Sequence, residues 1–186
     1  MPRGLALDLA CGGGRHARLL ASLGLEVLAV DRDPQAVAAT AGTRISTLAF
    51  DLERPEAAVD PAFPLATDRY AGIVVTNYLH RPLLPLLLSS LAEGGVLVYE
   101  TFAQGNGQFG KPSNPDFLLA PGELLQAVAG HPDHAHLRVL AYEDGFTALP
   151  KPAMVQRICV RRDEATGSCE AAALALDTLT GKQIPT

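Results

Sequence analysis

The chain has 186 residues, of which 48% are hydrophobic and 19% charged, so it can bury the core of one domain and is not a disordered chain. Its formal net charge of −5 gives no polyanion-binding signature, and we expect no nucleic-acid partner. The three cysteines (Cys11, Cys159 and Cys169) have no paired spacing, which argues against a disulfide framework or a zinc site and favours the cytoplasm.

The chain carries no sign of secretion or of membrane insertion. Residues 1–4 are not followed by the apolar core of a signal peptide. The densest apolar run, residues 82–91, is interrupted by Pro85 and two serines and falls short of the ~18 residues of a membrane span. We therefore expect no membrane partner.

Apolar runs that end in Gly, Pro or Asp predict seven strands. In chain order they cover residues 5–9, 25–30, 44–50, 70–76, 96–102, 137–142 and 154–160. Helical spacing predicts helices over residues 15–23, 34–41, 82–91 and 121–129, the second of them capped by Asp33. We expect a turn at Glu93–Gly95 and a loop over residues 105–115.

The alternation of strands and helices predicts an α/β fold with a mostly parallel sheet and right-handed crossovers. No helix separates the last two strands, so the last strand is expected to be antiparallel to its neighbour. Residues 1–162 are expected to form one domain. Residues 163–186 are read as a polar tail with a helix candidate at 170–179.

A glycine turn follows the first strand. Asp8 ends the apolar run, Gly12, Gly13 and Gly14 follow, and a helix begins. Glycines let a backbone approach a ligand where a Cβ would clash, and the helix N-terminus adds free N–H groups and a positive partial charge. This arrangement predicts a site for a nucleoside-type cofactor.

Three successive strands end in an acid: Asp8, Asp31 and Asp51. Ligands of open α/β sheets bind beyond the carboxyl ends of the strands. Asp31, nineteen residues after Gly12, is placed to accept hydrogen bonds from both ribose hydroxyls, and Asp51 from the amino group of adenine, with Leu52 packing on the ring. The alternative interpretation makes these residues loop acids and helix caps.

Two adenosine cofactors compete for this site. The sequence from Gly12 to Ala17 satisfies the G-x-G-x-x-G/A fingerprint, which favours an NAD(P)-dependent oxidoreductase. Asp8 would crowd a pyrophosphate but suits a cationic, methionine-like amine. An antiparallel last strand also points away from a nicotinamide fold. A third alternative is a non-catalytic binding protein.

The stretch Asp8-Leu9-Ala10-Cys11-Gly12-Gly13-Gly14 resembles the first motif of class I S-adenosylmethionine-dependent methyltransferases, acid-x-Gly-x-Gly-x-Gly, with Ala10 in place of the first glycine. The resemblance covers roughly residues 5–160 and is nearest to small bacterial enzymes similar to the tellurite-resistance and thiopurine methyltransferases. It implies a Rossmann-like three-layer sandwich, S-adenosylmethionine as cofactor, and in-line methyl transfer to a small-molecule acceptor by a monomer or homodimer.

Members of this family usually carry one or two helices before the first strand, and these cover the cofactor. Here the first predicted strand begins at residue 5. We therefore expect a longer chain, another segment or another subunit to supply that cover.

The resemblance also implies the roles of individual residues. Asp8 would lie near the methionyl amine, the glycine backbone beside the methionine and ribose, and Asn77 opposite the methyl group. Asp31 and Asp51 keep the ribose and adenine roles. The implied cofactor-binding set is Asp8, Ala10, Gly12, Gly13, Gly14, Asp31, Arg32, Asp51, Leu52 and Asn77.

Acid–base help is needed only where the nucleophile must lose a proton, and three side chains near strand ends could supply it: Tyr78, His80 and Glu100. Two of them could instead serve structure, His80 as a capping residue and Glu100 as a satisfied strand residue. Phe109 and Phe117, in and after the 105–115 loop, could wall a substrate or lie in a surface connection.

Three histidines, His131, His134 and His136, lie within six residues of one another. Pro132 breaks their spacing and no cysteine is near, so we expect no metal site there.

Overall fold

A seven-stranded sheet forms the centre of the computed structural model, which describes residues 4–164. The strands are β1 (Leu5–Leu9), β2 (Glu26–Asp31), β3 (Ile45–Ala49), β4 (Tyr70–Thr76), β5 (Leu91–Phe102), β6 (Leu137–Thr147) and β7 (Ala153–Arg162). The α-helices are α1 (Arg15–Ser22), α2 (Pro34–Thr40), α3 (Leu84–Ser89) and α4 (Glu123–Ala129). The helix candidate at 170–179 and Cys169 lie outside the described residues.

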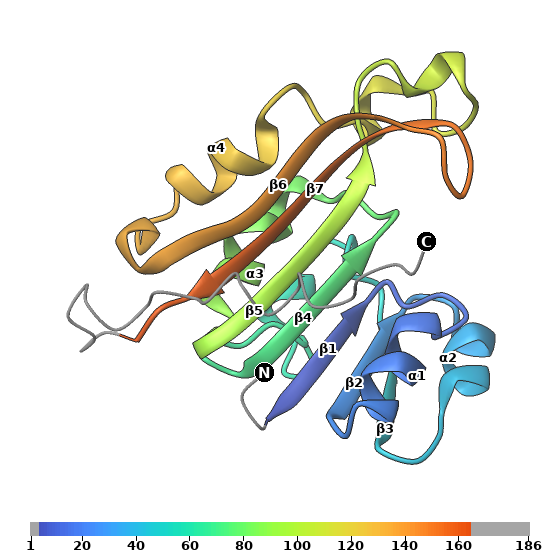
Figure 1. The fold of residues 1–186 in the computed structure, drawn as a ribbon. Helices are drawn as coiled ribbons and strands as arrows, with labels where there is room; N and C mark the ends of the chain where they lie inside the picture. The colour runs from blue at the N-terminus through green and yellow to red at the C-terminus, as the bar shows by residue number, and fades with distance from the viewer. Residues whose placement is uncertain (1–3, 165–186) are drawn as a thin grey trace, which may run out of the picture.

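The strand order is β3-β2-β1-β4-β5-β7-β6 (Figure 1). The β1–β2, β1–β4, β2–β3 and β4–β5 pairs are parallel, whereas β7 is antiparallel to both β5 and β6. The predicted α/β class, the seven strands and the antiparallel last strand are therefore confirmed. Strand order reverses between β1 and β4, which places a ligand-binding switch point beside the glycine turn.

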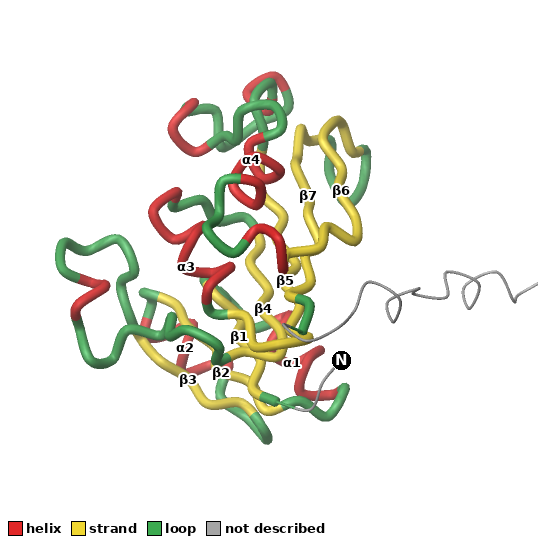
Figure 2. The backbone as a smooth tube through the Cα atoms, turned by 90° about the vertical axis from the view of Figure 1, so that its left-hand side faces the viewer, coloured by secondary structure: helices red, strands yellow, loops and turns green. Residues whose placement is uncertain are grey.

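Helices cover the two faces of the sheet at different strands (Figures 1 and 2). On one face α1 packs on β1 and β2 through a small cluster that includes Ala17, Leu20 and Val27. On the other face α3 and α4 close the larger core, which joins β1, β4, β5 and β7 and includes Ile73, Tyr99 and Leu124. In the described part of the chain, Figure 1 shows no helix in front of β5 and β7.

The local signals at the start of α2 act as predicted. Asp33 caps α2, with its Oδ1 accepting a hydrogen bond from the Gln35 N–H at 2.9 Å, and Pro34 begins the helix. The strand prediction for residues 70–76 matches β4, and that for residues 5–9 matches β1. The predicted and observed bounds agree here because each sequence signal lies within a single helix or strand.

Several boundaries differ from the prediction. The Glu93–Gly95 turn is part of β5, where the register against β4 shifts between Tyr70 and Gly72 and Gly94 takes φ 73°. The predicted 82–91 helix is a 3-10 turn over Arg81–Leu83 followed by the short α3. Gly122, with φ 72°, precedes α4 instead of lying in its first turn. Pairing with β7 extends β6 to Thr147.

None of the helices in residues 4–164 combines the length and the hydropathy that crossing a membrane requires.

Candidate functional site

The turn between β1 and α1 contains three residues with positive φ: Ala10 (55°), Gly12 (50°) and Gly14 (70°). An ideal Cβ on Gly14 would lie 2.3 Å from Thr40 Cγ2, so the packing against Thr40 requires a glycine at this position. A Cβ on Gly12 or Gly13 would meet nothing within 4 Å. These two glycines therefore leave open space beside the backbone, where a ligand can approach.

Asp31, at the end of β2, is tied to this turn. Its Oδ2 accepts a hydrogen bond from the Gly12 N–H at 2.8 Å, and its Oδ1 accepts one from the Asp33 N–H at 3.0 Å. The carboxylate is partly exposed. Because a carboxylate has about four lone-pair sites, the Asp31 oxygens keep free acceptor capacity for ligand hydroxyls.

Asp8 is only 1% exposed and holds α1 against β1. Its Oδ2 accepts a hydrogen bond from the Ala17 N–H at 2.7 Å. Burial raises the pKa of Asp8, and this effect outweighs the lowering by the Ala17 hydrogen bond and by the charges of His16 and Arg15. The structure thus places a buried acid directly behind the glycine turn.

We predict that Asp8→Asn changes the pH dependence of folding. The folded-state pKa of Asp8 is raised, so folded protein binds this proton more tightly than unfolded protein does. Its contribution to the free energy of unfolding therefore falls as the pH rises from the unfolded pKa through the folded one. The amide of the variant does not titrate, which removes this fall, and it keeps an oxygen for the Ala17 N–H. Urea unfolding of both proteins between pH 4 and pH 7 should show a smaller decline for the variant; parallel curves would contradict the assignment.

A cavity of about 260 Å³ opens beside the turn. Its volume lies near the lower end of ligand pockets, which run from about 300 to 1,000 Å³, and suits a nucleoside-sized group. Carboxylates and apolar surfaces both line it. The lining residues are Ala10, Asp31, Arg32, Phe50, Asp51, Leu52, Glu53, Tyr78 and Phe117.

The cavity brings together six residues from the predicted site: Ala10, Asp31, Arg32, Asp51, Leu52 and Tyr78. Two further lining residues, Phe50 and Glu53, were not predicted from the sequence, although both flank the Asp51–Leu52 pair and could have been found from that position. Phe117 was considered as a wall for the substrate, yet it shares this cavity with Asp31 and Asp51.

His16 is a further residue that the sequence analysis passed over. Its Nδ1 lies 3.4 Å from the Thr76 Oγ1 at the end of β4, and its charge acts on the Asp8 carboxyl. It therefore links the first turn of α1 to the end of β4. Its place two residues after Gly14 was the available signal.

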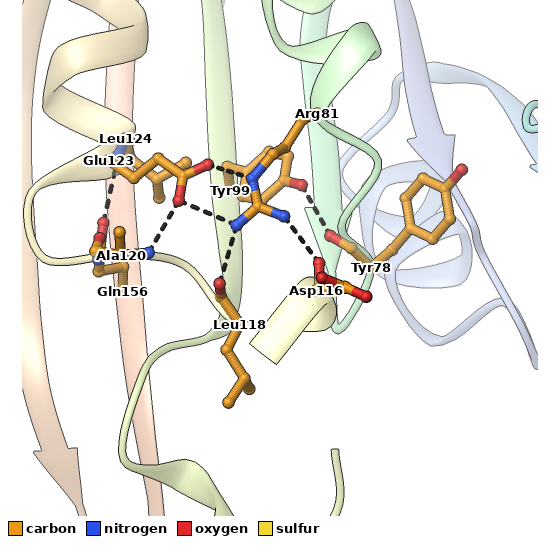
Figure 3. Close-up of polar contacts among 9 residues, drawn as sticks. All are labelled: Tyr78, Arg81, Tyr99, Asp116, Leu118, Ala120, Glu123, Leu124 and Gln156. Atoms are coloured by element: carbon orange, nitrogen blue, oxygen red, sulfur yellow. Dashed lines mark hydrogen bonds and ion pairs between the residues drawn. The ribbon is translucent and has the colours of Figure 1, made fainter. Parts of the chain in front are cut away.

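Tyr78 lines the cavity and is fixed at its backbone. Its carbonyl accepts a hydrogen bond from the Tyr99 hydroxyl at 2.7 Å (Figure 3). Burial and the negative charge of Glu53 raise the pKa of Tyr78 above its usual value. Tyr78 is therefore protonated at neutral pH and can donate a hydrogen bond there.

Asn77 and His80 follow the same strand. Asn77 has φ 55°, and its N–H donates to the Glu100 carbonyl at 2.9 Å, while its side chain is exposed. His80 is partly buried and precedes the Arg81–Leu83 turn, where its side chain makes no capping hydrogen bond. His80 does not line the 260 Å³ cavity.

Glu100 is engaged in an ion-pair chain. Its Oε2 pairs with Arg157 Nε on β7, and Arg157 Nη1 lies 2.9 Å from Glu143 Oε2 on β6. Because the neighbouring Tyr99 is buried in the α3–α4 core, Glu100 points to the opposite face of the sheet. To act as a base, Glu100 would first have to separate from Arg157.

The histidine cluster has a structural role at His131. The Nε2 of this buried side chain lies 2.9 Å from the Ser89 Oγ, and its Nδ1 accepts a hydrogen bond from the Asp133 N–H. His134 Nδ1 lies 3.0 Å from the His131 carbonyl. Both ring nitrogens of His131 are thus used within the protein.

Comparison with known proteins finds one family. Residues 7–80, from β1 to the end of β4, match the family described as methyltransferase domain. No curated protein sequence matches the chain.

Many solved structures share the fold. An S-adenosylmethionine-dependent methyltransferase from Mesorhizobium loti is 18% identical with a TM-score of 0.64, and the match covers 87% of this chain and 94% of that one. TehB from Haemophilus influenzae is 21% identical with a TM-score of 0.64, and the match covers 88% of this chain but only 59% of TehB.

A third similar structure was determined with ligands bound. It is the 1,6-didemethyltoxoflavin-N1-methyltransferase of Burkholderia thailandensis with bound 1,6-didemethyltoxoflavin and S-adenosylhomocysteine. It is 20% identical with a TM-score of 0.54, and the match covers 87% of this chain and 72% of that one.

Proposed function

We propose that this chain transfers a methyl group from S-adenosylmethionine to a small-molecule acceptor. Its residues 7–80 match the methyltransferase-domain family, and its fold is similar to that of S-adenosylmethionine-dependent methyltransferases. The domain match and the fold support S-adenosylmethionine-dependent methyl transfer. The observation that carries the proposed site is the cavity at the switch point, where Asp31 and Asp51 meet apolar walls.

The residues around this cavity fit the cofactor. A nucleoside needs a carboxylate for its ribose hydroxyls and apolar surfaces for its base, and the cavity offers Asp31 and Asp51 with Phe50 and Leu52. The open space at Gly12 and Gly13 leaves a path for the methionine part. We propose as cofactor-binding residues Asp8, Ala10, Gly12, Gly13, Gly14, Asp31, Arg32, Asp51, Leu52 and Asn77.

When bound, the cofactor supplies an electrophilic methyl group on a sulfonium with a neutral leaving group. The protein then has to orient the acceptor in line with that methyl and keep water out. Of the three acid–base candidates, Tyr78 borders the cavity and carries a proton, which suits it to orient an acceptor. His80 is the remaining candidate for a base, and Glu100 would act only when released from Arg157.

We further propose a cytoplasmic, bacterial enzyme that works as a monomer or homodimer on a free small molecule, with residues 1–162 as its domain. The net charge of −5 supports a partner other than nucleic acid. The similar structures named above come from bacteria.

Calorimetric titration of the full chain with S-adenosylhomocysteine tests the proposal. We expect saturable binding at one site, with NAD(H) giving no heat of binding under the same conditions. The nicotinamide alternative is not favoured, because β7 is antiparallel and lies between β5 and β6, unlike the parallel dinucleotide-binding sheet. Saturable binding of NAD(H) without binding of S-adenosylhomocysteine would reverse this conclusion.

A further inference from the structure

The guanidinium of Arg81 holds two stretches that lie more than thirty residues later in the sequence (Figure 3). Its Nε donates to Glu123 Oε1 at 2.6 Å, and its Nη2 to Glu123 Oε2 at 3.1 Å. Its Nη1 donates to the Asp116 carbonyl at 2.7 Å, and its Nη2 also to the Leu118 carbonyl at 2.9 Å. Arg81 thus connects the segment after β4 with the Pro115–Phe117 turn and the start of α4.

Glu123 completes this network. Its Oε2 also accepts a hydrogen bond from the Ala120 N–H at 2.8 Å. Burial alone would raise the pKa of Glu123, but the hydrogen bonds from Arg81 and Ala120 hold it below its usual value. Glu123 is therefore charged at neutral pH, which strengthens the two-point contact with the guanidinium.

Phe117 lies between the two residues whose carbonyls Arg81 holds. It lines the same cavity as Asp31 and Asp51, yet it is 52% exposed. A side chain this exposed is not held by core packing, so its place at the cavity depends on the backbone that carries it. Arg81 fixes that backbone on both sides of Phe117.

We propose that Arg81 is a positioning residue: it holds Phe117 at the cavity, and Phe117 contacts the bound nucleoside. This inference rests on the proposed function, since it assumes that the cavity takes the nucleoside of S-adenosylmethionine. Arg81 itself does not line the cavity and acts through Phe117. The geometry matters because a planar, forked guanidinium serves both carbonyls and the carboxylate at once, which an ammonium cannot do.

A double-mutant cycle tests this role. The dissociation constant of S-adenosylhomocysteine is measured for the full chain, Arg81→Gln, Phe117→Ala and the double variant. Each single change is expected to weaken binding about three- to tenfold, the worth of one aromatic contact. The double variant should bind within about twofold of the weaker single variant, because Arg81 has no further effect once the ring is gone.

Arg81→Lys should recover part of the affinity that Arg81→Gln loses, because an ammonium can reach one of the carbonyls. Arg44→Gln serves as the matched control: it breaks the exposed ion pair with Glu26, away from the cavity, and should leave the dissociation constant unchanged. Thermal melts followed by circular dichroism establish that each variant folds. If Arg81→Gln does not fold, the same cycle is run with Arg81→Lys.

Three outcomes are distinguishable. Non-additive losses support the positioning role. Additive losses, or unchanged affinity in folded Arg81→Gln, overturn it while leaving the proposed function intact. Absence of S-adenosylhomocysteine binding by the unmodified chain overturns the proposed function and this inference with it.

Discussion

Asp31→Ala is expected to weaken the binding of S-adenosylhomocysteine by more than tenfold. The carboxylate lies in the cavity with acceptor sites to spare, and its removal would leave two ribose hydroxyls without partners in a partly buried site. It would also release the Gly12 N–H, which now donates to Asp31 at 2.8 Å. Calorimetric titration at pH 7 measures the change, and each tenfold loss corresponds to about 1.4 kcal/mol.

Asp33→Ala is the matched control, two residues away on the same loop. Asp33 caps α2 through the Gln35 N–H, so its loss should cost about 1 kcal/mol of stability and leave cofactor affinity unchanged. The same affinity in Asp31→Ala as in the unmodified chain would show that the cofactor does not meet this carboxylate. Equal losses in both variants would mean that the loop, and not the Asp31 carboxylate, is what the ligand needs.

Gly14→Ala is expected to have the largest effect on folding, about 2–5 kcal/mol of destabilisation. A Cβ there would lie 2.3 Å from Cγ2 and 2.4 Å from Oγ1 of Thr40, and φ is 70°. Thr40 is 1% exposed, and its Oγ1 donates to the Ala36 carbonyl at 2.9 Å, so it cannot easily turn away. Overpacking of about 1–3 kcal/mol and backbone strain of about 1–2 kcal/mol add up to that range. Urea unfolding measures it.

Gly13→Ala separates the two roles of the turn. Its Cβ would meet no protein atom within 4 Å, so stability should stay within about 0.5 kcal/mol. If cofactor passes this backbone, affinity should nevertheless fall. In the Gly14→Ala background, Thr40→Ala should restore part of the lost stability by removing the two nearest atoms. A Gly14→Ala protein as stable as Gly13→Ala would show that α2 yields to the added methyl group.

The Asp31 substitution and the Arg81 cycle probe two distant parts of the chain that contribute residues to one cavity. The glycine turn and Asp31 come from the β1–α1 and β2–α2 connections, whereas Phe117 comes from the segment between β5 and α4. Ligand affinity should therefore respond to changes in either part of the chain. The destabilisation by Gly14→Ala, by contrast, arises only where the turn packs on Thr40. This division follows from the switch point, where loops from both halves of the sheet meet.

Sequence by itself determined the features that short stretches encode. The run that ends in Asp8, the glycines after it, and the acids that close the next two predicted strands indicated the α/β fold and six residues of the cavity. These signals are local, because strand ends, caps and turns depend on neighbouring residues. The turn predicted at Glu93–Gly95 failed for the converse reason: pairing with β4 carries β5 through the glycines.

Only the tertiary structure decided which distant residues meet. Phe117 reaches the cavity of Asp31 and Asp51 because Arg81, which follows β4, holds the backbone on both sides of Phe117. The sequence left Glu100 open between an acid–base candidate and a satisfied strand residue. In the structure it is paired with Arg157, a partner that the antiparallel β5–β7 register selects. Such contacts depend on strand order, register and loop placement together, and no single segment of the chain contains that information.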